Sequence, residues 1–243
     1  MVEKEKILIP SEDSELFQEA WETARSNHGY DFTFYLPGMI RYGLERGRYP
    51  VISITGDECE LMCKHCMGQL LEPMIKVTEP GELIKRCNRL NQSEYFGILL
   101  SGGSDRKGRL PWKRYYSAIK KIKDETSLFV SAHLGLPDQE TCRQLKDVGI
   151  NQALIDVMGD DITSSKIYNL DGLKPVIHAL NNIKKADLHL IPHIVAGLYY
   201  GKIKAEYQAL EIIRQYIPAA LVIVVLNPLK GTTLAHVQPP SPL

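Results

Sequence analysis

Three cysteines lie within eight residues of one another, at Cys59, Cys63 and Cys66, directly after the β-branched run Val51–Thr55. Thiolates ligate iron–sulfur clusters, and three of them can hold three corners of a 4Fe-4S cluster. A fourth protein ligand would close the cluster for electron transfer, whereas three ligands leave one iron open to a small molecule. The spacing therefore predicts a cluster-binding loop that leaves a strand.

The histidine between the last two cysteines, His65, allows a second interpretation, a zinc ion held by the three thiols and this imidazole. Cysteines two residues apart are common zinc ligands, but structural zinc sites usually combine two well-separated pairs. This loop has no second pair, and His65 is too close in sequence to Cys63 and Cys66 to complete the same tetrahedron easily. We favour the cluster and keep a non-catalytic zinc-binding module as the alternative.

Composition limits the kinds of partner. The 243 residues contain 29 Lys and Arg against 29 Asp and Glu, so no general field attracts nucleic acid or an anionic membrane. The longest apolar run, 219–226, is too short to span a bilayer. The amino terminus is charged and its short apolar patch, Ile7–Ile9, is stopped by Pro10, so it makes a poor signal peptide. An odd number of cysteines, five, suits a reducing compartment. We expect a cytoplasmic protein whose substrate is a small molecule or a protein-bound group.

From residue 51 onward, short apolar runs alternate with helical patterns, which predicts an α/β fold with a parallel sheet and crossover helices. The expected strands, each apolar enough to be buried on both faces, are 51–55, 97–100, 128–131, 152–155, 188–195 and 221–226. The expected helices are 79–92, 112–125, 138–148, 172–184 and 205–216.

The ends of the chain are expected to differ from this core. An amphipathic helix over 14–27, laid against the main body, and a solvated connector make up an amino-terminal segment, 1–50, and the core occupies 51–243. The prolines after the sixth strand, in 238–243, are typical of a chain about to begin another helix. We therefore expect a carboxy-terminal part beyond residue 243.

Polar side chains follow the expected strands, at the ends that form the open face of parallel barrels. Adjacent glycines let the backbone approach a ligand closely, although an isolated pair is usually an ordinary turn. An aspartate leaving an apolar strand is costly to bury without partners, so we expect it to contact a ligand. Strand-end histidines are often structural. The candidates are Ser101, Gly102, Gly103, Ser104, Ser131, His133, Asp156, His193, Gly197, Tyr199 and Asn227.

The two remaining cysteines, Cys87 and Cys142, fall on helical patterns beside leucines. We expect both to pack as small hydrophobic residues.

The sequence resembles the biotin-synthase-related radical S-adenosylmethionine (SAM) proteins over about residues 30–243. The resemblance is carried by Leu36–Gly38, Tyr49–Thr55, the cysteine loop, Ser101–Gly103 and Asn227–Thr232. It implies a partial TIM-type (β/α)6 barrel, the radical SAM core, with an N-terminal helical extension. It also implies a 4Fe-4S cluster whose open iron chelates the amino and carboxylate groups of SAM.

The same resemblance implies roles for the strand-end residues. Cofactor contacts are expected from His65 against the adenine, from the Ser101–Ser104 segment to the SAM ammonium, with Ser104 in place of the usual acid, and from Ser131, Asp156, Gly197 and Asn227. Substrate contacts are expected from His133, His193 and Tyr199. No residue is assigned as a catalytic acid or base.

Within that group, the chain looks closest to homologues that include one partner of the two-protein lipoyl synthases. That likeness implies a transferase that inserts sulfur into a carrier-protein-bound octanoyl chain, after a 5′-deoxyadenosyl radical abstracts hydrogen. Such enzymes take sulfur from an auxiliary cluster, for which Cys87 and Cys142 are too few, so a second iron–sulfur protein or a further part of the chain would supply ligands. A biotin-synthase-like radical enzyme with another substrate is the alternative.

Overall fold

The computed structural model describes residues 14–31, 33–36, 38–39 and 41–241. By its internal contacts the chain divides into two compact units, 1–35 and 36–243. The predictions that fall on residues 1–13, on Phe32 and on Pro37, including the poor signal peptide, lie outside the described residues. The predicted boundary at residue 50 stays a prediction.

In the first unit, the predicted amphipathic helix is present as α1 (Ser14–His28). It ends at Gly29, whose φ of 68° and N–H bond to the Arg25 carbonyl, 2.9 Å, are typical of a glycine-terminated helix. The packing of this helix against the main body stays a prediction.

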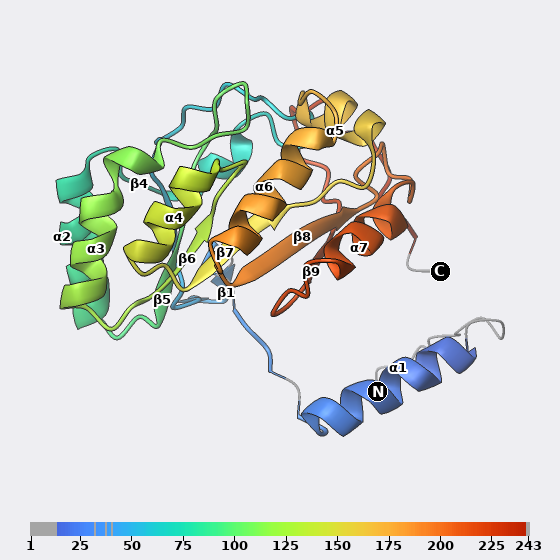
Figure 1. Cartoon of the computed structure of the whole chain (residues 1–243), viewed down its shortest axis with the longest axis horizontal. Coiled ribbons are helices and arrows are strands. Elements are labelled where there is room, and N and C mark those ends of the chain that lie inside the picture. The colour runs from blue at the N-terminus through green and yellow to red at the C-terminus, as the bar shows by residue number, and fades with distance from the viewer. Residues whose placement is uncertain (1–13, 32, 37, 40, 242–243) are drawn as a thin grey trace. The chain divides into compact units, whose positions relative to one another are not determined.

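The second unit is built on a parallel sheet of seven strands in the order β4-β3-β5-β6-β7-β8-β9 (Figure 1). Six of them match the six predicted strands, which confirms the α/β fold, and the two-residue β4 is an addition at one edge. The strands are β3 (Val51–Ser53), β4 (Ile75–Lys76), β5 (Gly97–Ser101), β6 (Phe129–His133), β7 (Gln152–Asp156), β8 (Leu190–Ala196) and β9 (Val222–Val225). A separate antiparallel pair, β1 (Arg41–Tyr42) and β2 (Glu45–Arg46), lies in the predicted connector.

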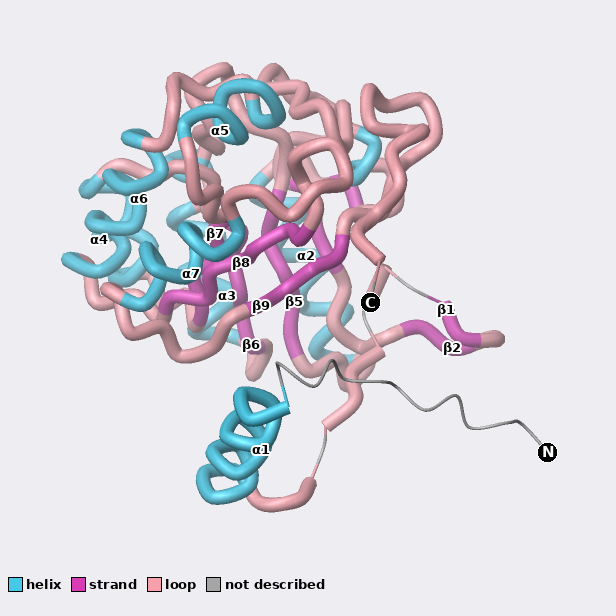
Figure 2. The backbone as a smooth tube through the Cα atoms, turned by 90° about the vertical axis from the view of Figure 1, so that its right-hand side faces the viewer, coloured by secondary structure: helices cyan, strands magenta, loops and turns pink. Residues whose placement is uncertain are grey.

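The crossover helices lie along one face of this sheet and leave the other face toward the interior of the partial barrel (Figures 1 and 2). They are α2 (Pro80–Gln92), α3 (Tyr116–Glu125), α4 (Gln139–Asp147), α6 (Lys174–Lys185) and α7 (Glu206–Arg214), with short 3-10 turns η2 (Gln69–Leu71) and η3 (Trp112–Arg114). All five were predicted, within a few residues at their ends. Among the described residues, no helix combines the length and apolar character needed to cross a membrane.

One further helix, α5 (Asp161–Tyr168), was not predicted, because its Thr-Ser-Ser core has no apolar residues at helical spacing. A cap starts it instead, since the Asp160 carboxylate accepts a hydrogen bond from the Thr163 N–H at 2.6 Å. It ends at Asn169, which adopts a left-handed conformation with φ 56°.

The central strands divide apolar and polar side chains between their two faces. Successive strand residues point to opposite sides, and the buried apolar residues that face the helices are Val130, Ala132, Ala153, Ile155 and Ile194. The inner face carries Ser131, His133, Gln152, Asp156 and His193 at the alternate positions. The inner face is therefore only partly apolar, because these polar groups lie beside the buried Leu154 and Ile191.

The last strand also departs from the expectation of burial on both faces. In β9, Ile223 is 62% exposed and Val225 is 55% exposed. The prediction is wrong here because β9 is an edge strand and no helix follows it among the described residues to cover its outer face.

A buried tyrosine joins the helix layer to the strand that leads into the cysteine loop. Tyr115 is fully buried, and its hydroxyl donates to the carbonyl groups of Ile54 at 2.8 Å and Val77 at 3.4 Å. These two acceptors directly follow the ends of β3 and β4.

A Tyr115→Phe variant is therefore expected to lose about 1–3 kcal/mol of unfolding free energy, because it leaves buried acceptors without a donor. Denaturant unfolding measures this loss. Tyr207→Phe is the matched control, because Tyr207 is 73% exposed and its hydroxyl makes no hydrogen bond among the described residues. Equal stability of the two variants would contradict the role given to the Tyr115 hydroxyl.

Candidate functional site

The cysteine loop follows β3 and is held against the end of β5. The hydroxyl of Thr55 accepts a hydrogen bond from the Gly103 N–H at 2.7 Å, and the carbonyl of Ser104 accepts one from the Glu60 N–H at 2.8 Å. A Cβ atom on Gly103 would lie 2.6 Å from Cα of Cys59 and closer still to the carbonyl oxygen of Glu58. The glycine was predicted to let the backbone approach a ligand, and the structure shows that it approaches the cysteine loop itself.

The other side of the loop is held by α5 and the residue after it. The Lys64 N–H donates to the carbonyl of Ile167 at 2.8 Å, and the Asn169 amide donates to the carbonyl groups of Leu61 at 2.8 Å and Met62 at 3.0 Å. Met62 has a φ of 47°, so the loop turns sharply at this point. The cysteines are thus held between the end of β5 and helix α5, at the carboxyl edge of the sheet. The sequence did not reveal α5.

The thiols of Cys63 and Cys66 shift each other's pKa. Cys63 is buried, whereas Cys59 and Cys66 are partly buried. A hydrogen bond from the Cys63 thiol, together with neighbouring His65, lowers the pKa of Cys66 to about 4. The same pairing and burial raise the pKa of Cys63. A thiolate forms readily here, as ligation of an iron–sulfur cluster requires.

The geometry argues against the zinc alternative. Among the described residues, the set of three or more His, Cys, Asp or Glu ligand atoms that gathers within 4.8 Å is His133, Asp156 and His193. The loop thiols and His65 do not form such a set, although a single zinc ion would need them in one small tetrahedron. A four-iron cluster is larger than one ion and accommodates thiols that lie further apart.

A polar cluster occupies the inner face beside this loop. His133 Nε2 donates to Asp156 Oδ1 at 3.2 Å, and the Tyr168 hydroxyl donates to Asp156 Oδ2 at 2.9 Å. The rings of His133 and His193 have centroids 5.7 Å apart. His65, predicted to contact adenine, lies with its ring 5.0 Å from that of Tyr168 and so connects the loop to the cluster.

The charges within this cluster are coupled. Burial alone would lower the pKa of His133, but the Asp156 carboxylate outweighs it and raises that pKa. Burial would likewise raise the pKa of Asp156, but His133 holds it well below its usual range. Burial and the charge of His133 lower the pKa of His193. The arrangement therefore favours a charged His133–Asp156 pair beside a neutral His193.

Two of the other predicted cofactor residues, Ser131 and Ser101, have structural partners. The hydroxyl of Ser131 shares a hydrogen bond with the Tyr49 hydroxyl at 2.5 Å and donates to Gln152 Oε1 at 3.1 Å. The Ser101 carbonyl accepts from the Ile54 N–H at 2.8 Å, and Asn227 is exposed. Their contacts with a cofactor, and that of the Ser104 hydroxyl, stay predictions.

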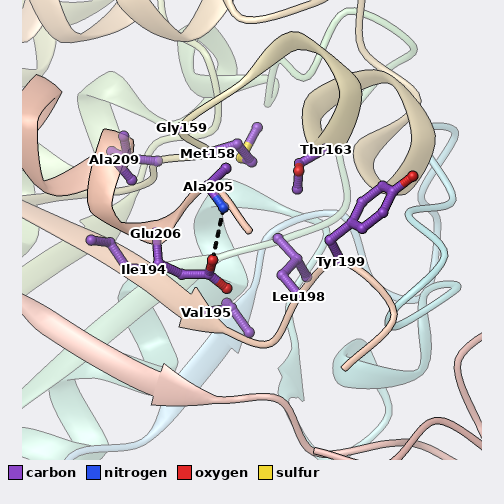
Figure 3. Close-up of a pocket in the computed structure, with 11 residues that line it drawn as sticks. Met158, Gly159, Thr163, Ile194, Val195, Leu198, Tyr199, Ala205, Glu206 and Ala209 are labelled. Atoms are coloured by element: carbon purple, nitrogen blue, oxygen red, sulfur yellow. Dashed lines mark hydrogen bonds between the residues drawn. The ribbon is translucent and has the colours of Figure 1, made fainter. Parts of the chain in front are cut away.

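The segment after β8 forms a small pocket (Figure 3). Glu206 fixes it, accepting hydrogen bonds from the N–H groups of Gly197 at 2.8 Å and Ala205 at 2.9 Å. The lining includes Tyr199 and Ile194. Because Ile194 follows His193 on the strand, it points to the opposite face. Val195, which lies on the same face as His193, also lines the pocket. The predicted ligand contacts of Gly197 and Tyr199 stay predictions.

Sequence reasoning missed three residues that organise the site: Thr55, Tyr49 and Tyr168. Tyr168 lies on the helix that periodicity could not reveal. Thr55 and Tyr49 were quoted only as parts of motifs, and their hydroxyl bonds link segments far apart in the sequence. The predicted structural role of Cys87 and Cys142 is confirmed, since both are fully buried on α2 and α4.

Sequence comparison relates the chain to biotin synthases. It is 27% identical to the biotin synthase of Pelobacter propionicus over 206 residues, which cover 79% of this chain and 60% of that protein. It is 29% identical to the biotin synthase of Methanococcus aeolicus over 197 residues, 75% of this chain and 56% of that protein. The chain thus spans somewhat more than half the length of these relatives. No protein-family model matches it.

Structural comparison agrees on the fold. Methylornithine synthase superposes with a TM-score of 0.70 and 16% identity, over 97% of this chain and 66% of that one. Streptococcus suis SuiB bound to S-adenosylmethionine superposes with a TM-score of 0.61 and 11% sequence identity, over 97% of this chain and 51% of that one. Coproporphyrinogen III oxidase from Escherichia coli, described as a radical SAM enzyme, superposes with a TM-score of 0.51 and 11% sequence identity, over 80% of this chain and 48% of that one.

Proposed function

We propose that this chain, which has the radical SAM fold and is similar in sequence to biotin synthases, is an enzyme that cleaves SAM reductively. Cys59, Cys63 and Cys66 would hold a 4Fe-4S cluster with one open iron. When bound and reduced, such a cluster supplies the electron that splits SAM into methionine and a 5′-deoxyadenosyl radical, which abstracts hydrogen from a strong C–H bond. The observation that carries the proposal is the three-thiol loop, fixed at the carboxyl edge of a parallel sheet beside a polar inner face.

The residues of the chain would position and shield this chemistry. Gly103 and Asn169 hold the loop from its two sides, so the cysteines keep their place when a ligand arrives. At the opposite end of the strands, the Tyr49 side chain packs over Gly97 and bonds Ser131. Substrate and SAM would therefore enter from the carboxyl ends, where His133, Asp156 and His193 lie.

The test is anaerobic reconstitution with iron and sulfide, followed by incubation with SAM and a reductant. We expect about four irons and four sulfides per chain and the formation of 5′-deoxyadenosine, measured by chromatography. A protein that keeps its iron–sulfur spectrum but gives no nucleoside product would contradict the proposal. Zinc retained at the thiols, without iron or sulfide, would favour the zinc-binding module.

A finer proposal concerns the substrate: sulfur insertion into an octanoyl chain on a carrier protein. Burial raises the pKa values of Cys87 and Cys142 to about 12, and both face the helix–sheet interface. They are poor ligands for a second cluster, so the sulfur-donating cluster would be held by a second iron–sulfur protein or by a further part of the chain. The experiment adds octanoylated carrier protein, with and without other iron–sulfur proteins, and measures the mass of one added sulfur. Deoxyadenosine without this mass would favour another substrate.

A further inference from the structure

Three side chains of types that can bind metal ions converge on the inner face, and none of them belongs to the cysteine loop. One nitrogen of His133, one nitrogen of His193 and one oxygen of Asp156 lie within 4.8 Å of one another. Strand register produces this convergence. Asp156 is directly opposite His193 across β7 and β8, and His133 is opposite Leu154, two residues before Asp156 and so on the same face.

The distances suit a metal ion. Bonds of about 2.0–2.2 Å from zinc to nitrogen and oxygen place two ligands of a tetrahedron about 3.3 Å apart. His133 Nε2 and Asp156 Oδ1 already lie 3.2 Å apart, and a metal ion bound between them would take the place of the proton that Nε2 otherwise donates to the carboxylate. The second carboxylate oxygen accepts the hydrogen bond from Tyr168, an outer contact of the kind that orients a metal-bound carboxylate.

The third side chain, His193, has a buried nitrogen without a hydrogen-bond partner. Nδ1 of His193 is buried and has no hydrogen-bond partner among the described residues. Buried polar atoms are normally satisfied, because an unpaired one costs free energy. The hydrogen bond between His133 and Asp156 leaves Nδ1 of His193 without a polar partner, and a metal ion held between the three side chains would supply one.

We propose that His133, Asp156 and His193 bind one divalent transition-metal ion, zinc or ferrous iron, at a site separate from the cysteine loop. Two imidazoles and one carboxylate are a ligand set of both metals, and three protein ligands leave a coordination position open. Side-chain exposures of 27% for His133 and 29% for Asp156 leave the site accessible. With one carboxylate, the divalent site carries a net charge of +1, so the open position favours an anionic donor such as a carboxylate or a thiolate.

Zinc tests the proposal, because it is distinguished from cluster iron by element analysis. The reconstituted full-length chain is equilibrated with Zn²⁺ under anaerobic conditions and desalted, and its metals are then counted. We expect about one zinc per chain, with X-ray absorption showing only nitrogen and oxygen ligands at about 2.0–2.1 Å. A shell of sulfur ligands at about 2.3 Å would overturn the proposal. So would a protein that, after desalting, retains neither zinc nor added ferrous iron.

Variants locate the ion. His193→Gln and Asp156→Asn should each lower zinc affinity at least tenfold, and Tyr168→Phe about tenfold through the lost outer contact. Cluster iron and sulfide should stay at the level of the unaltered protein in all three. His189→Gln is the matched control, because His189 precedes the same strand and is exposed. Zinc affinity that is unchanged in both ligand variants would overturn the proposal, whereas loss of the cluster alone would bear only on the cysteine loop.

Discussion

A Cys63→Ala variant is expected to bind less than a tenth of the cluster iron of the unaltered protein and to form no detectable 5′-deoxyadenosine. Cys63 is the buried member of the three thiols, and its thiol donates a hydrogen bond to the carbonyl of Tyr168 at 3.9 Å. Its loss removes one of three corners and leaves two thiolates, too few to hold the cluster. Iron and sulfide are counted after anaerobic reconstitution, and the nucleoside is measured with SAM and reductant present.

The matched controls are Cys87→Ala and Cys142→Ala. Each removes a buried thiol from a helix without touching the loop, so cluster content and deoxyadenosine formation should be unchanged. Unfolding free energy should fall modestly, because a small buried group is lost. If Cys63→Ala kept its cluster while folded, or if Cys87→Ala lost it, the assignment of the three loop cysteines would be wrong.

The fold followed from the sequence because each buried strand is a short apolar run between helical patterns. Helices packed on the sheet, such as α4 and α6, carry apolar residues at helical spacing and were predicted. Helix α5 escaped prediction because a capping aspartate, Asp160, starts it rather than an apolar stripe. The burial predicted for β9 failed because hydrophobicity cannot tell whether a neighbour covers an edge strand.

The site was predictable in part. The cysteine spacing identifies a cluster loop by itself, because ligands and loop are local in sequence. Strand ends also pointed to His133, Asp156 and His193 one by one, but their meeting depends on register between three strands, which no local pattern encodes. The hydroxyl of Tyr168 could not be foreseen, since its helix was missed and its partner Asp156 lies before that helix.

A Gly103→Ala variant is expected to disturb the cysteine loop as strongly as the loss of a ligand. The new methyl group would lie 2.6 Å from Cα of Cys59 and even closer to the Glu58 carbonyl, both of them backbone atoms that cannot rotate away. Either the loop or the end of β5 must move, which costs about 1–3 kcal/mol or more of unfolding free energy. Movement of the loop shifts Cys59 directly, so reconstituted iron should fall by at least half.

Gly81→Ala separates this effect from the general effect of adding a methyl group. Gly81 lies exposed in the first turn of α2 with nothing within 4 Å of its added Cβ, so alanine there should raise stability by about 0.5–1 kcal/mol. Denaturant unfolding and iron content are measured for both variants. A Gly103→Ala protein with unaltered stability and full cluster content would show that the contact between β5 and the loop is not what positions Cys59. The thiols would then have to be held by α5 and Asn169 alone, and an Asn169→Ala variant should lose the cluster instead.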